Sequence, residues 1–155
     1  MLYLVHLVHA YFMFVTPLTF LNYKSTKKQK ILFTITYALG SILSRKIYSF
    51  FPSIFGSHTL ILIILSSILF KSIVREFTWN KSIYTSLMLF IMLLINDTLI
   101  IVPVMNTFGL TVEKLETSIS LTCIVSIVLN NLTLMIGLII CYLRNPKDGH
   151  VSLNS

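Results

Sequence analysis

The chain has 155 residues, of which 55% are apolar and only 11% are charged, and its mean hydropathy is +0.87. Soluble domains carry about 25% charged residues, so this chain has too few charges to cover a water-exposed surface. Several spans of about 20 residues each would leave no room for a separate soluble catalytic domain. The composition therefore predicts a multi-pass protein of the cytoplasmic membrane, with the lipid bilayer as its first partner.

Five apolar segments follow one another along the chain. They are continuous and do not alternate as the strands of a membrane barrel do, and backbone groups in lipid must be satisfied internally, so each segment predicts a helix. We expect an all-α bundle of about five transmembrane helices, followed by a short cytoplasmic tail at 144–155. The spans are predicted near 2–23, 31–51, 58–74, 82–108 and 117–143.

The charges gather in alternate loops. The chain contains 12 Lys and Arg against 5 Asp and Glu, a net charge of +7. Four lysines lie within 24–30, the third loop carries Lys71, Arg75 and Lys81, and the fourth loop, 109–116, is net acidic. Basic residues collect in cytoplasmic loops, so the N-terminus is expected outside and the C-terminus in the cytoplasm. The positive charge then reflects topology and not a nucleic-acid partner.

Three polar doublets interrupt the spans at similar depths, counted at 1.5 Å per residue from the cytoplasmic end of each span. All three are expected in the outer half of the bilayer, where a charge is costly. They are Arg45-Lys46, Asn96-Asp97 and Asn130-Asn131.

We expect Asp97 to face the bundle and to form an ion pair with Arg45 or Lys46 of the second span. This polar layer is a candidate ligand-binding site or a switch between two packings. The alternative is that its polar contacts only hold the helices together. The fourth span also contains Pro103, which is expected to kink that helix or to end its regular part, and is a candidate hinge.

No residue cluster predicts an enzyme, a cofactor or a metal site. Motifs for phosphate binding, dinucleotide binding, zinc proteases and nucleophile elbows are absent from the sequence. His6 and His9 share a helical face, but no carboxylate or cysteine is near them in sequence, so we expect them in the headgroup region. Cys123 and Cys141 lie in one span, roughly 27 Å apart along a helix, too far for a disulfide with each other.

The order of these features resembles a known family. The features are a lysine-rich loop from Lys24 to Lys30, a second span broken between Arg45 and Pro52, a Phe-x-x-x-Lys-Ser join from Phe77 to Ser82, and an acidic residue in the outer half of the fourth span, Asp97. Over about residues 1–143 this resembles the membrane input region of bacterial peptide-sensing histidine kinases, the quorum-sensing class with a GHKL-type ATPase domain.

The resemblance implies that the outer half of the bundle receives a secreted peptide and that the last span relays the change to a cytoplasmic kinase. Arg45, Asp97 and Asn130 would lie near the ligand. The family's kinase domain follows the last span, whereas here twelve residues follow and Asn145-Pro146 ends the helix. We therefore expect a non-catalytic, homodimeric sensor module of a two-component system that acts through a cytoplasmic kinase or another membrane protein.

Two alternatives remain at this stage. A small transporter subunit or permease component would need its polar layer to be reached by water from each side in turn. A structural subunit would instead stabilise a larger membrane complex and co-purify with it.

Overall fold

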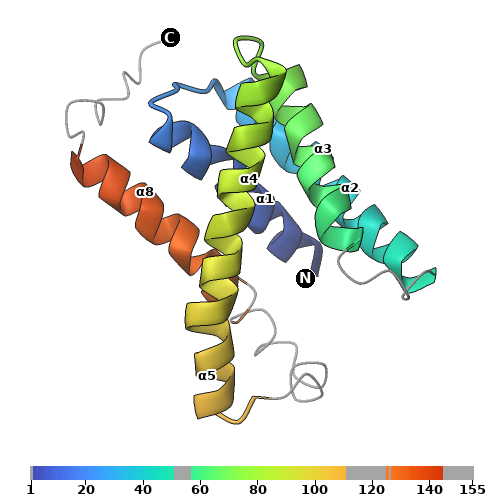
Figure 1. The fold of residues 1–155 in the computed structure, drawn as a ribbon, viewed down its shortest axis with the longest axis vertical. Helices are drawn as coiled ribbons and strands as arrows, with labels where there is room; N and C mark the ends of the chain where they lie inside the picture. Colours follow the sequence, from blue (N-terminus) through green and yellow to red (C-terminus); the bar gives the residue numbers. More distant parts are fainter. Residues whose placement is uncertain (1, 51–56, 111–124, 126, 145–155) are drawn as a thin grey trace.

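The structure is a computed structural model that describes residues 2–50, 57–110, 125 and 127–144, and every regular element in these ranges is helical (Figure 1). The all-α prediction is confirmed for them. The elements are α1 (Leu2–Phe20), α2 (Lys27–Phe50), α3 (Ser57–Ile73), α4 (Trp79–Asn96), the π-helical segment η1 (Asp97–Ile101), α5 (Val102–Thr107), the 3-10 turn η2 (Leu129–Asn131) and α8 (Leu132–Arg144).

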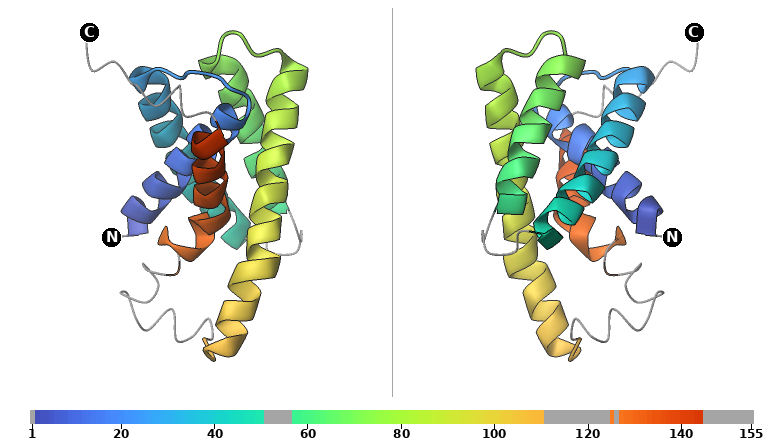
Figure 2. Two further views of the ribbon diagram at one scale, coloured as in Figure 1. Left: turned by 90° about the vertical axis from the view of Figure 1, so that its left-hand side faces the viewer. Right: turned by 90° about the vertical axis from the view of Figure 1, so that its right-hand side faces the viewer.

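Successive helices from α1 to α4 are antiparallel neighbours in the bundle. Each of the helices α1, α2 and α3 packs against the next helix along the chain, and α8 returns to pack against α1 and α4 (Figure 2). Within the described residues no Cα atom of α2 lies within 8 Å of one of α4, because α3 and α1 lie between the two helices. This order decides which polar residues can meet.

Two helices are long and apolar enough to cross a membrane, Tyr3–Phe20 and the 29-residue stretch Trp79–Thr107. Two shorter apolar helices cover Thr59–Ile73 and Leu129–Arg144. The predicted span 82–108 corresponds to the continuous series α4, η1 and α5, and the predicted span 58–74 to α3. Within the predicted span 117–143 only 125 and 127–143 are described, while the loop 111–116 and the tail beyond Arg144 lie outside the described residues.

Helix α2 begins at Lys27, earlier than the predicted span 31–51, because the preceding residues form a capping box. The backbone N–H of Thr26 donates to Gln29 Oε1 at 2.9 Å, and the N–H of Gln29 donates to Thr26 Oγ1 at 3.3 Å. Three of the four lysines that the sequence assigns to the loop, Lys27, Lys28 and Lys30, are therefore in the first turn of the helix, and Lys24 remains in the turn before it. A second cap starts α4, where the N–H of Lys81 donates to Thr78 Oγ1 at 3.3 Å.

A cluster of aromatic rings fills the core near the turns 21–26 and 74–78. Phe33 of α2 has its ring centroid 4.7 Å from that of Phe14 in α1 and 4.9 Å from that of Phe70 in α3. Phe77, in the turn before α4, extends the cluster at 6.4 Å from Phe70. Lys24 and Arg75 lie in these two turns, and further lysines lie in the helical turns beside them (Lys27, Lys28, Lys30, Lys71 and Lys81), so we call this end of the bundle the basic end (Figure 1).

The surface of the bundle is apolar where that of a soluble bundle is polar, and hydroxyl and amide side chains share the interior with the aromatic core. Large aliphatic side chains point outwards on each long helix, for example Leu39, Ile64 and Leu94, which are 63%, 59% and 66% exposed. Hydroxyl and amide side chains are buried between the helices instead. The buried polar residues are Thr16, Ser41, Ser44, Ser66, Ser67, Ser82, Thr85, Ser86, Asn96 and Asn131.

Candidate functional site

The candidate site lies away from the basic end, where two helices lose their regular α-helical form. Helix α4 passes into η1 at Asp97, and the last helical segment passes through η2 before α8 begins. The segments η1 and η2 lie against each other. Irregular helical turns in a packed bundle are often found at functional sites, which makes this junction the candidate site.

Pro103 accounts for the irregularity in the longer helix. A proline inside an α-helix lacks an N–H, and its ring clashes with the carbonyl four residues earlier. The helix widens just before this residue, where the N–H of Val102 donates to the carbonyl of Asp97 five residues back. The expected disturbance therefore takes the form of a π-helical segment over Asp97–Ile101, and the helix continues through Pro103 to Thr107.

Asn96 joins α4 to the beginning of α8. Its side chain is fully buried. The Nδ2 group donates to the carbonyl of Leu129 at 2.9 Å, and Oδ1 accepts from the N–H and the Oγ1 of Thr133 at 3.1 and 2.8 Å. Thr133 is the second residue of α8, and such N–H groups have no partner within their own helix. One side chain of α4 thus caps α8 and bridges both sides of its irregular turn.

Asn131 joins the same turn to α1. This residue is fully buried, and its Nδ2 donates to the carbonyl of Ile127 at 2.9 Å. Its Oδ1 lies 2.8 Å from Nδ1 of His9. Because an amide oxygen only accepts, this contact requires His9 to carry its proton on Nδ1. The hydroxyl of Thr16 adds a further α1 contact, to the carbonyl of Leu134 at 3.3 Å.

We refer to His9, Asn96, Asn131 and Thr133 as the asparagine network. It connects α1, α4 and α8 around the turn η2. The sequence predicted that the two asparagine doublets would lie together, but it placed His9 in the headgroup region and did not single out Thr133. A polar group inside a helical bundle needs a partner. This rule, applied to the half-buried His9 and the two asparagines, is the signal that the sequence offers. Asn130, next to Asn131, is half-buried.

The predicted ion pair between the second and fourth helices is not formed. Arg45 and Lys46 are exposed on α2, which does not touch α4, and within the described residues neither is joined to Asp97. Successive residues of a helix point about 100° apart, so Asn96 and Asp97 point in different directions, although a hydrogen bond joins their side chains. Asn96 turns towards α8 and Asp97 towards α3.

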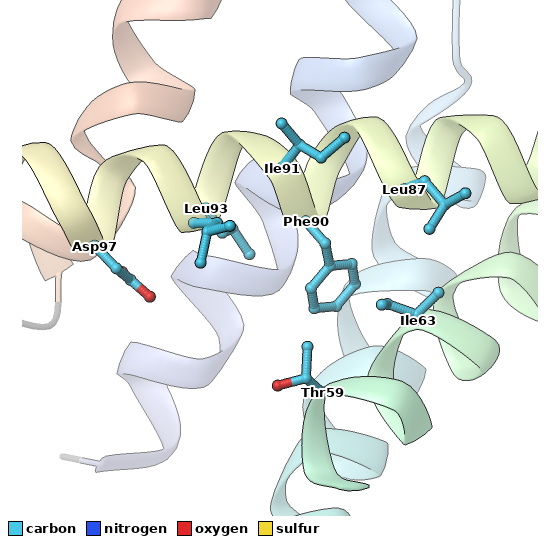
Figure 3. A pocket seen from close by; sticks show the side chains of 8 residues that line it. Thr59, Ile63, Leu87, Phe90, Ile91, Leu93 and Asp97 are labelled. Carbon is cyan, nitrogen blue, oxygen red and sulfur yellow. The ribbon is translucent and has the colours of Figure 1, made fainter. Parts of the chain in front are cut away.

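Asp97 lines an open pocket between α3 and α4 with a volume of about 380 Å³ (Figure 3). Figure 3 shows the carboxylate at one end of a row of α4 side chains, with Thr59 and Ile63 of α3 facing that row. All other lining residues are apolar. The pocket is lined by Thr59, Ile63, Leu87, Phe90, Ile91, Leu93, Leu94 and Asp97.

The fold and this site define an all-helical protein with two helices able to cross a membrane and a polar junction inside the bundle. No protein-family model, curated protein or solved structure matches the chain. Within the described ranges, no three His, Cys, Asp or Glu side chains gather as the ligands of a metal ion would.

Proposed function

We propose that the chain is a multi-pass protein of the cytoplasmic membrane and that it works as a non-catalytic sensor module. An extracellular ligand acts on the outer half of the bundle, and α8 relays the change to a cytoplasmic partner. The observation that carries this proposal is the double link from Asn96 to Leu129 and Thr133, which couples α4 to both sides of the turn before α8.

The placement in a membrane is supported by the exposed aliphatic surface and the buried hydroxyl groups, since lipid can solvate the former but not the latter. The lysines and the arginine in and beside the turns 21–26 and 74–78 lie at the basic end, which the positive-inside rule assigns to the cytoplasm. Five spans with the N-terminus outside would then put the asparagine network in the outer half.

The relay depends on the length and direction of α8. This helix has 13 residues and extends about 20 Å towards the basic end. Because a helix moves as a rigid unit, a shift of α4 at Asn96 displaces the far end of α8 near Arg144 as well. A partner that contacts this end would sense the displacement.

Cysteine accessibility tests both the topology and the sensor role. In a chain with Cys123 and Cys141 replaced by Ser, single cysteines at Lys28, Asp97 and Asn106 are treated with a membrane-impermeant maleimide in intact cells and in inverted vesicles. We expect Asn106 and Asp97 to react only from outside and Lys28 only from the cytoplasmic side. Reaction of Lys28 and Asn106 from the same side would overturn the topology.

A transporter subunit is the second candidate function, and the contact between η1 and η2 favours it. Many transporters bind their substrates between two interrupted helices at mid-membrane. In that case a cysteine at Asp97 would react with the maleimide from both sides of the membrane. Holding the protein open to one side would lower the rate of reaction from the other side. Reaction from outside only supports the sensor.

The cytoplasmic partner and the expected homodimer are tested by cross-linking in native membranes. Cross-linking to a different protein in a fixed stoichiometry would favour a structural subunit.

A further inference from the structure

We propose that the pocket between α3 and α4, here called the α3–α4 groove, binds a small amphiphilic cation: an ammonium group attached to an apolar body. The ammonium group lies against the carboxylate of Asp97, and the apolar body lies along α4. This inference names the ligand class for the sensor module and so rests on the proposed function for its orientation in the membrane.

The lining of the groove fits such a ligand. Its volume of about 380 Å³ falls within the range of about 300–1,000 Å³ that is usual for small-molecule sites. Phe90 projects into the groove between Ile63 and the row of α4 side chains (Figure 3). Only Thr59 and Asp97 offer polar groups. A mostly apolar wall with few polar groups is the common composition of ligand sites.

The charge of the groove selects a cation. The two basic residues that the sequence offered as partners of Asp97 belong to α2, which does not reach α4. Among the described residues no basic side chain pairs with the carboxylate of Asp97, which has a side-chain hydrogen bond with the neutral amide of Asn96. A carboxylate without a counter-charge within lipid costs about 2.5–3.5 kcal/mol at the bilayer centre and less towards the interface. A bound ammonium group offsets this cost, whereas a neutral ligand leaves it and an anion increases it.

Asp97 is also well placed to be reached from outside. It follows Trp79 by 18 residues, about 27 Å along the helix, so it lies close to the outer boundary of a hydrocarbon core about 30 Å thick. A cation could therefore enter from the extracellular side without crossing the membrane centre. The neighbouring Asn96 is hydrogen-bonded to Thr133 of α8. A ligand in the groove would therefore contact α4 next to the residue that links α4 to α8, the helix that relays the signal.

The test uses the full chain in nanodiscs of phosphatidylcholine, a lipid without net charge, and isothermal titration calorimetry. The probes are phenylbutylammonium, phenylbutanol and phenylbutyrate, which share an apolar body and differ in charge. We expect saturable binding of the ammonium probe and no competition by the other two. Asp97→Asn should weaken binding at least tenfold, while Glu76→Gln, an exposed carboxylate in the turn before α4, should leave it unchanged.

Leu94→Trp provides a second variant, because it fills the groove without altering a charge and should also abolish binding. The proposal is overturned if phenylbutanol binds as tightly as phenylbutylammonium, which would mean simple filling by lipid-like molecules. It is also overturned if Asp97→Asn or Leu94→Trp, still folded, binds the cation normally. If the ammonium probe does not bind but the cysteine placed at Asp97 reacts only from outside, this inference is wrong and the proposed function stands. If the probe binds but that cysteine does not react from outside only, the ligand class stands and the orientation of the sensor in the membrane is wrong.

Discussion

The basic end and the asparagine network hold the same helices together by different means. At the basic end the rings of Phe14, Phe33 and Phe70 pack closely, and the side chain of Gln29 donates to the carbonyl of Ile73 at 3.1 Å. Around the network, directional hydrogen bonds support irregular turns in two helices. Packed rings gain stability from many weak contacts that all require one arrangement of the helices. A few hydrogen bonds, in contrast, can be replaced by hydrogen bonds to other partners when the helices move. The difference indicates that one end anchors the bundle and the other can change.

The anchoring end should be the more sensitive to truncation. Phe33→Ala removes a fully buried ring in contact with two other helices. We expect a loss of about 3–5 kcal/mol in the free energy of unfolding, the usual cost of deleting a core phenylalanine. The loss is measured by unfolding the purified protein from mild detergent with increasing dodecyl sulfate. Leu32→Ala, at the neighbouring half-exposed position, is the control, and equal losses would contradict the anchoring role.

Loss of Asn96 should cost less but act at a distance. Asn96→Leu leaves the N–H of Thr133 and the carbonyl of Leu129 without this partner, at an expected cost of about 1–3 kcal/mol. Hydrogen exchange of the Thr133 amide should speed up, and the amides near Phe33 should stay protected. Ile95→Ala, on the exposed side of α4, should alter neither. If exchange rises equally at both ends, the two regions are not independent.

Gly137 lies where α8 passes from the network towards the basic end. A Cβ atom at this position would lie 2.9 Å from Phe20 Cε2 and 3.1 Å from Met92 Cε. Both atoms are at the ends of side chains that can move, so Gly137→Ala should cost about 1 kcal/mol, at the low end of overpacking effects. Met92→Ala should recover part of this loss in the double variant. Absence of any recovery would mean that the closer contact, with Phe20 of α1, and not the contact with Met92 sets the cost.

The smallest expected effect concerns His9 and Asn131. In a double-mutant cycle of His9→Ala and Asn131→Ala, we expect a coupling of about 0.6 kcal/mol, the average for polar contacts between membrane helices. The same dodecyl sulfate titration measures it. A coupling near zero would leave α1 outside the network and restrict it to α4 and α8.

The sequence alone determined the helical class, the apolar character of the helices and the clustering of basic residues between them. These properties follow from composition and from runs of apolar residues, which do not depend on how the helices are arranged. It also predicted that Asn96 and Asn131 would matter, because a polar side chain in an apolar helix needs a partner.

Only the tertiary structure decided which partners these residues have. Asn96 and Asp97 are adjacent in sequence, and counting residues cannot tell which of the two turns inwards. The order of packing places α8 and not α2 beside α4, so Asn96 caps the last helix and Arg45 stays out of reach of Asp97. Helix–helix packing fixes the rotation of each helix about its axis, and that rotation separates the asparagine network from the α3–α4 groove.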